Sequence, residues 1–161
     1  MYITEKYWGE YLGGTDDSLT LLDYLAAKGK EEIPLGEIFA DFGAERLEGD
    51  FQRPGESLVY ETGEGYEMAI DCAVDFITDL AALLLECRVS GGLDTAELEI
   101  DTDLAVIRIP AGEEELEVVR DALDAFVEDP LGCGLAGLVP EEDLREMAAL
   151  CGELRKELFG A

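Results

Sequence analysis

A row of carboxylates is the most regular chemical feature of the sequence. Residues 112–128 have the apolar periodicity of an amphipathic helix, and the opposite side carries acidic residues spaced 3, 4, 3 and 4 apart: Glu114, Glu117, Asp121, Asp124 and Glu128. On an α-helix this spacing stacks the carboxylates along one face, at roughly every 5 Å of rise. Like charges so placed repel one another, so the row indicates a surface that meets a basic partner. The alternative is a solvated helix face in a protein that is acidic throughout.

The whole chain is strongly acidic. Its 161 residues include 39 Asp and Glu against 11 Lys and Arg, which gives a net charge of −28. The hydrophobic content of 48% indicates a folded core, because disorder requires low hydrophobicity as well as high charge. A field of this sign attracts basic proteins and repels nucleic acid and anionic membranes. We therefore expect a basic protein as the partner, with adaptation to salt or to solubility as the alternative cause of the charge.

The sequence contains no recognisable catalytic set. Histidine is absent, which removes the usual base for a nucleophilic Ser or Cys and a common zinc ligand. The cysteines form no CxxC pair: they are Cys72, Cys87, Cys133 and Cys151. These observations predict a non-enzymatic protein that uses no cofactor and no metal. A carboxylate-dependent metal enzyme is a further alternative, for which residues 16–17 and 101–103 hold the closest carboxylate pairs.

Aromatic residues are concentrated near the N-terminus, where residues 1–11 are predicted to form a short strand. Tyr2, Tyr7, Trp8 and Tyr11 lie in this segment. Aromatic rings with a polar tip are enriched at interface hot spots, so Trp8 and Tyr11 are candidates for contact with a partner. They can equally fill the core with the polar tip at the surface.

Periodicity and capping residues predict the other elements. Helices are expected from the caps at 15–18 to Gly29, after Pro34, over 76–89 with Asp75 as the cap, over 112–128, and from Pro140 onward. Strands are expected at 57–62 and 66–74, which form one hairpin, and at 97–101 and 104–109, which form another. This order predicts an α+β class, in which an antiparallel sheet of two hairpins packs with a central buried helix, 76–89, and flanking helices.

The chain length fits a single α+β domain over residues 1–161. Residues 1–8 lack the basic start and apolar run of a signal peptide. The most apolar stretch, 76–89, is too short to span a bilayer and contains Asp79, Glu86 and Arg88. Together with cysteines that suggest free thiols, these features predict a cytoplasmic protein.

A small, acidic, histidine-free α+β chain of this kind resembles the immunity proteins of bacterial polymorphic and contact-dependent toxin systems. The stretch YWGEYLGGTDD, residues 7–17, looks like a family signature. The resemblance implies that the protein binds a cognate toxin domain, often a basic nuclease, and blocks its active site. An adaptor or structural domain, whose acidity serves only solubility, is the alternative function.

Overall fold

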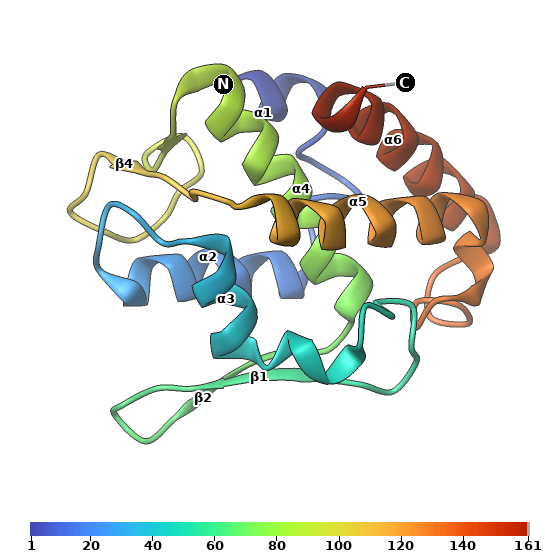
Figure 1. Cartoon of the computed structure of the whole chain (residues 1–161), viewed down its shortest axis with the longest axis horizontal. Coiled ribbons are helices and arrows are strands. Elements are labelled where there is room, and N and C mark those ends of the chain that lie inside the picture. The colour runs from blue at the N-terminus through green and yellow to red at the C-terminus, as the bar shows by residue number, and fades with distance from the viewer. Residues whose placement is uncertain (161) are drawn as a thin grey trace.

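A computed structural model describes residues 1–160 and confirms the α+β class (Figure 1). In this part of the chain the helices are α1 (Tyr2–Lys6), α2 (Asp16–Lys28), α3 (Leu35–Phe42), α4 (Ala73–Ser90), α5 (Glu113–Glu128) and α6 (Glu141–Phe159), with 3-10 turns η1 (Ala44–Leu47) and η2 (Pro130–Gly132). The strands are β1 (Leu58–Glu61), β2 (Glu67–Ile70), β3 (Leu93–Asp94) and β4 (Val106–Ile107).

Helix α4 is the central element, and the prediction of a central buried helix is confirmed. Every residue from Ala73 to Glu86 is buried, because α1, α2, α5 and α6 all contact this helix. Figure 1 shows α4 running between α5 on the near side and the N-terminal segment behind it. The helix stops where Gly91 takes a left-handed conformation with φ of 83°, a geometry that glycine adopts without strain.

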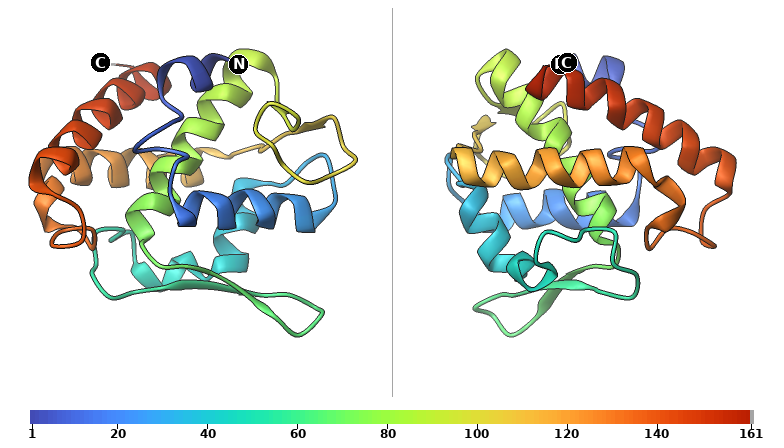
Figure 2. Two further views of the ribbon diagram at one scale, coloured as in Figure 1. Left: turned by 180° about the vertical axis from the view of Figure 1, so that it is seen from behind. Right: turned by 45° about the vertical axis from the view of Figure 1, so that its right-hand side comes forward.

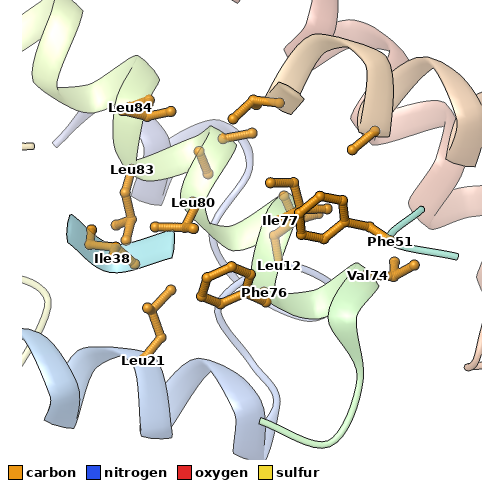
Figure 3. Close-up of a cluster of buried hydrophobic side chains, with 14 of the residues drawn as sticks. Leu12, Leu21, Ile38, Phe51, Val74, Phe76, Ile77, Leu80, Leu83 and Leu84 are labelled. Atoms are coloured by element: carbon orange, nitrogen blue, oxygen red, sulfur yellow. The ribbon is translucent and has the colours of Figure 1, made fainter. Parts of the chain in front are cut away.

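An aromatic cluster joins α4 to the elements around it. The ring of Phe76 lies within 6.4 Å, centroid to centroid, of Phe39 and Phe42 from α3 and of Phe51 beyond η1. Figure 3 shows Leu21 of α2 and Ile38 of α3 extending the same cluster beside Phe76 and Leu80. The core therefore contains side chains from both ends of the sequence, packed around α4.

The two hairpins form separate small sheets instead of a single sheet. Strand β1 pairs antiparallel with β2, from Leu58 opposite Ile70 to Glu61 opposite Glu67. Strand β3 pairs antiparallel with β4 over two residue pairs. The sheets lie on different sides of the molecule, with the β1–β2 ribbon below α3 and the β3–β4 pair beside the end of α4 (Figures 1 and 2).

The predicted strand at 97–101 is wrong. The Asp94 carboxylate accepts hydrogen bonds from the backbone N–H of Ala96 and Glu97, at 3.0 and 3.1 Å, and this turns the chain. Glu99 then has a φ of 58°, outside the strand region. The alternation that suggested a strand still places Leu98 and Ile100 inward, since both are buried.

The predicted N-terminal strand is also wrong, because residues 2–6 form helix α1. The buried carboxylate of Glu86 accepts the backbone N–H of Ile3 at 2.8 Å, which satisfies one of the free donors at the start of this helix. Ile3 and Tyr7 are buried four residues apart on one side of the segment, as helical spacing requires.

Helix α2 begins with a side-chain cap, whereas α4 does not. Thr15 and Ser18 form a capping box at α2, so the predicted cap region and the stop at Gly29 are confirmed. Asp75 does not cap α4: Cys72 is the N-cap residue, and Asp75 lies inside the first turn with a buried side chain. The earlier start follows from Asp17, whose carboxylate accepts the backbone N–H of both Asp71 and Cys72.

Candidate functional site

The α5 carboxylate row lies on the exposed side of its helix. Its members are Glu114, Glu117, Asp121, Asp124 and Glu128, and all are exposed. The opposite side of α5 buries Val119, Ala122, Leu123 and Phe126 against the core. The predicted amphipathic arrangement of this helix is therefore confirmed, whereas its use for binding stays a prediction.

Two members of the α5 row are paired with cations. Asp124 accepts a hydrogen bond of 2.8 Å from the Arg155 guanidinium, which ties α5 to α6. Asp121 lies 3.3 Å from the guanidinium of its neighbour Arg120. In residues 1–160, no ion pair involves Glu114, Glu117 or Glu128. The row is thus an exposed ridge with free charge at its ends.

The local fold explains the position of Trp8. The backbone N–H of Gly9 donates to the carbonyl oxygen of Leu12 at 2.6 Å, which closes a tight loop over 8–13. Gly13 has a φ of 83°, and a Cβ there would lie 2.2 Å from the indole ring. Trp8 is consequently half-buried against its own loop, and its contact with a partner stays a prediction.

Tyr11 joins the N-terminal segment to the start of α6. Its hydroxyl donates a hydrogen bond to Glu146 and lies 3.4 Å from Asp143. Glu10 is exposed next to it. We call these residues the Tyr11 surface: Glu10, Tyr11, Asp143 and Glu146. Here one aromatic residue stands among several carboxylates.

The structure does not bring the Tyr11 surface and the α5 row together. In Figure 1, α5 lies on the near side of α4 and the segment between α1 and α2 lies behind it. In the view from behind, at the left of Figure 2, that segment is nearest the viewer and α5 lies behind. Most of the α5 row therefore lies on the other side of α4 from the loop that carries Tyr11, whereas Glu128, its last member, lines a hollow together with Arg145 of α6.

A pocket of about 210 Å³ opens beside Tyr11. Four stretches of chain line it: the segment between α1 and α2, the first turn of α4, the loop before α6, and α6 itself. Its polar lining is Glu10, Tyr11, Thr15, Asp75 and Asp143, and its apolar lining is Leu135, Val139 and Met147. Acidic and apolar groups thus converge in one small cavity.

Three carboxylates are buried where α2 meets α4. Asp17, Asp75 and Asp79 retain 7%, 5% and 1% of their exposure. Asp79 accepts hydrogen bonds from the Ser18 hydroxyl at 2.6 Å and from the Gly13 backbone N–H at 3.0 Å. Asp17 accepts two backbone N–H groups at 2.9 and 3.0 Å. Asp79 therefore holds the loop that carries Tyr11 against α4, and Asp17 holds the first turn of α2 to the start of α4.

Burial raises the pKa of two of these carboxyl groups. The pKa of Asp79 rises to about 7, chiefly through desolvation, while the hydrogen bonds from Ser18 and Gly13 act in the opposite direction. Desolvation also raises the pKa of Asp75, to about 8, with further contributions from the charge of Asp79 and from the carboxyl of Asp17. Of the pair, Asp75 is the one that lines the pocket.

The comparison with protein families decides the identity of the chain. A family model described as Immunity protein 68 matches residues 2–158. The chain belongs to the Immunity protein 68 family. Comparisons with curated proteins and with solved structures give no match.

Membership of the Immunity protein 68 family confirms the resemblance to the immunity proteins of polymorphic toxin systems. Immunity proteins are generally non-enzymatic and bind cognate toxins, so the partner is a protein. The matched residues 2–158 include the α5 row, the Tyr11 surface and the pocket. Among residues 1–160, no three His, Cys, Asp or Glu side chains are grouped to hold a metal ion, and no helix is both long and apolar enough to cross a bilayer.

Sequence reasoning missed most of the pocket of this Immunity protein 68 member. Asp75 and Asp79 are four residues apart, so they lie on one side of an otherwise apolar helix, and that spacing is the available signal. Glu10 and Asp143 meet only through the fold, since they are far apart in the sequence. The stretch 7–17 acts structurally, because its glycines close the loop, Thr15 caps α2, and Asp17 accepts the backbone N–H groups that precede α4.

Proposed function

We propose that this immunity protein neutralises its toxin by binding a basic region of the toxin through the Tyr11 surface. The observation that carries the proposal is the convergence of Glu10, Tyr11, Asp143 and Glu146 around the mouth of the pocket. A rigid aromatic residue among carboxylates, beside a concave site, has the character of an interface hot spot. Opposite charge on the toxin gives fast association and fixes its orientation.

An apolar side chain completes this surface. Leu138 has an exposed fraction of 80% and lies between Leu135 and Val139, two residues that line the pocket. The centre of a protein interface is depleted in charge and enriched in apolar area, so Leu138 supplies a contact that carboxylates cannot. We place this binding in the cytoplasm, where the four cysteines, all free thiols in this structure, stay reduced.

The α5 row supports a second, weaker assignment. Its end residues are free of ion pairs, so the row adds to the negative field that attracts a basic toxin. However, Asp124 is engaged by Arg155, and the hollows beside Glu117 and Glu128 are lined by cations of the protein itself, Arg120 and Arg145. We therefore assign long-range attraction to the α5 row and direct contact to the Tyr11 surface.

A matched pair of charge reversals separates the two assignments. The probe is the toxin encoded by the neighbouring gene, whose binding is measured by surface plasmon resonance at low and at moderate salt. One variant combines Glu10→Lys with Glu146→Lys, and the other combines Glu114→Lys with Glu117→Lys, so each changes the net charge equally. All four positions are exposed, and reversal there leaves the core intact.

We expect the first variant to weaken affinity by at least 100-fold, mainly through faster dissociation, and the second to slow association only a few-fold. Equal losses would show that only the overall charge matters. A loss confined to the second variant would move the contact to the α5 row. An unmodified protein that neither binds this toxin nor protects cells from it would contradict the proposed function.

A further inference from the structure

The pocket beside Tyr11 has the size of a single side chain. Its volume of about 210 Å³ lies below the range of roughly 300–1,000 Å³ that is usual for small-molecule sites. The pocket has an apolar wall, formed by Leu135, Val139 and Met147. Its carboxylates come from Glu10, Asp75 and Asp143. Lysine and arginine combine a long apolar stem with a cationic head, which is the combination that such a lining complements.

Asp75 is the buried carboxyl of this pocket, and no cation or N–H group of the described residues faces it. Its residue is 95% buried, with 5% of its surface exposed, and no donor within residues 1–160 gives its side chain a hydrogen bond. Its polar neighbour is the carboxyl of Asp17, with which it pairs when it carries a proton. A buried carboxyl whose polar partner is another carboxyl has no positive charge beside it, so the side of Asp75 that faces the pocket is complementary to a cation.

The protein has no cation of its own at this position. In the described part of the chain, none of the ion pairs involves Glu10, Asp75 or Asp143. The nearest basic residue in the sequence, Arg145, is paired with Glu141 at 2.7 Å. The pocket is consequently free to accept a positive charge from another molecule.

We propose that this pocket receives one lysine or arginine side chain of the toxin, whose cationic head meets the Asp75 carboxyl. This inference rests on the proposed function and names the contact at its centre. The stem packs on the apolar wall, while Glu10 and Asp143 contact the head at the pocket mouth. Removing a buried charge partner from such a contact costs far more than removing a charge from the rim of an interface.

Binding of the cation is coupled to loss of a proton. Because burial raises the pKa of Asp75 above neutrality, most free molecules carry a proton there at pH 7. An incoming ammonium or guanidinium group favours the carboxylate, and the proton leaves to solvent as the complex forms. The other titratable groups around Asp75 are Asp17, Asp79, Glu10, Tyr11 and Asp143, together with the thiols of Cys72, Cys133 and Cys151.

Calorimetry with the toxin encoded by the neighbouring gene tests the inference. Titrations at pH 7 in phosphate and in Tris, whose heats of ionisation differ, give the number of protons released. We expect release approaching one proton per complex for the unmodified protein. For Asp75→Asn we expect at least about 30-fold weaker binding and no release, whereas Asp103→Asn, at an exposed position outside both surfaces, should change neither quantity.

A second variant controls for an effect of the Asp75→Asn substitution on folding. Val139→Trp, at the half-buried edge of the pocket, fills it while leaving the residue at position 75 unchanged, and should also weaken binding. Unchanged affinity in both variants would overturn the pocket contact and leave the proposed function standing. Weaker binding of Asp75→Asn with the same proton release would overturn the role of its carboxyl. Absence of binding by the unmodified protein would remove the proposed function and this inference together.

Discussion

The Ser18 hydroxyl donates a hydrogen bond of 2.6 Å to the buried carboxylate of Asp79 and so joins the first turn of α2 to α4. Ser18 also takes part in the capping box, because its backbone N–H donates to the Thr15 hydroxyl oxygen at 3.0 Å. Asp79 accepts the Gly13 backbone N–H at 3.0 Å as well. A single carboxylate therefore fixes both the start of α2 and the loop that presents Tyr11.

Replacing Ser18 with alanine should destabilise the protein. The change removes half of the capping box and leaves Asp79 with one hydrogen bond fewer in a buried position. We expect the free energy of unfolding to fall by about 2–3 kcal/mol, measured by urea denaturation. Ser57→Ala is the control, since Ser57 lies outside the core. This substitution should change the free energy of unfolding by less than about 0.5 kcal/mol. Similar values for the two variants would mean that the Ser18–Asp79 bond contributes little.

Gly13 should not tolerate a side chain. Its φ of 83° disfavours any other residue, and a Cβ would lie 2.2 Å from the Trp8 ring. We expect Gly13→Ala to lower the free energy of unfolding by about 2 kcal/mol and to shift the emission of Trp8, the single tryptophan in the chain. Gly63→Ala, where a Cβ meets nothing within 4 Å, is the control. Unchanged emission in Gly13→Ala would show that the loop opens freely.

Asp75 should make stability depend on pH. Its pKa rises from 3.8 to about 8 on folding, so the folded state binds the proton more tightly than the unfolded state. The resulting stabilisation is complete below about pH 4 and is lost as the pH rises through about 8. Each tenfold difference in proton affinity between the two states is worth about 1.4 kcal/mol. Asp75→Asn mimics the protonated carboxyl and should be free of this loss.

The measurement is a series of urea denaturations between pH 4 and pH 9. The variant should match the unmodified protein near pH 4 and exceed it increasingly toward pH 9, by an amount on the order of a few kcal/mol. Asp79, whose pKa is also raised, interacts with the charge of Asp75, so the difference between the two proteins includes the effect of this interaction. Asp103→Asn, at an exposed position, is the control. A constant difference across the range would show that Asp75 is ionised in the folded protein.

The helices with a clear apolar face were predictable from sequence. In α6 the buried residues recur at helical spacing in the sequence: Leu144, Met147, Ala148, Cys151, Leu154 and Leu158. The N-terminal segment was not predictable, because its helix depends on a hydrogen bond from Ile3 to Glu86, a partner 83 residues away. The 97–101 segment has the right inward residues but the wrong backbone, because the side chain of Asp94 turns the chain ahead of it.

Of the candidate site, too, one part was predictable from the sequence and another was not. The α5 row follows from helical spacing alone, and its exposure was correctly predicted. The pocket could not be predicted, because its lining comes from segments that are distant in sequence and are brought together around α4. What the sequence does contain is the pair Asp75 and Asp79 in an apolar run, and acidic residues four apart in a buried helix indicate a polar centre.

Phe76 should be the most sensitive position of the aromatic cluster. Its ring is 1% exposed and neighbours Phe39, Phe42 and Phe51, so truncation leaves a cavity that three rings cannot fill together. We expect Phe76→Ala to lower the free energy of unfolding by about 3–5 kcal/mol in urea denaturation. Leu19→Ala is the control, because Leu19 lies on α2 with 61% of its surface exposed, and it should cost less than about 0.5 kcal/mol. A loss below about 2 kcal/mol for Phe76→Ala would mean that the rings around it repack, and that α4 is held mainly by its aliphatic contacts.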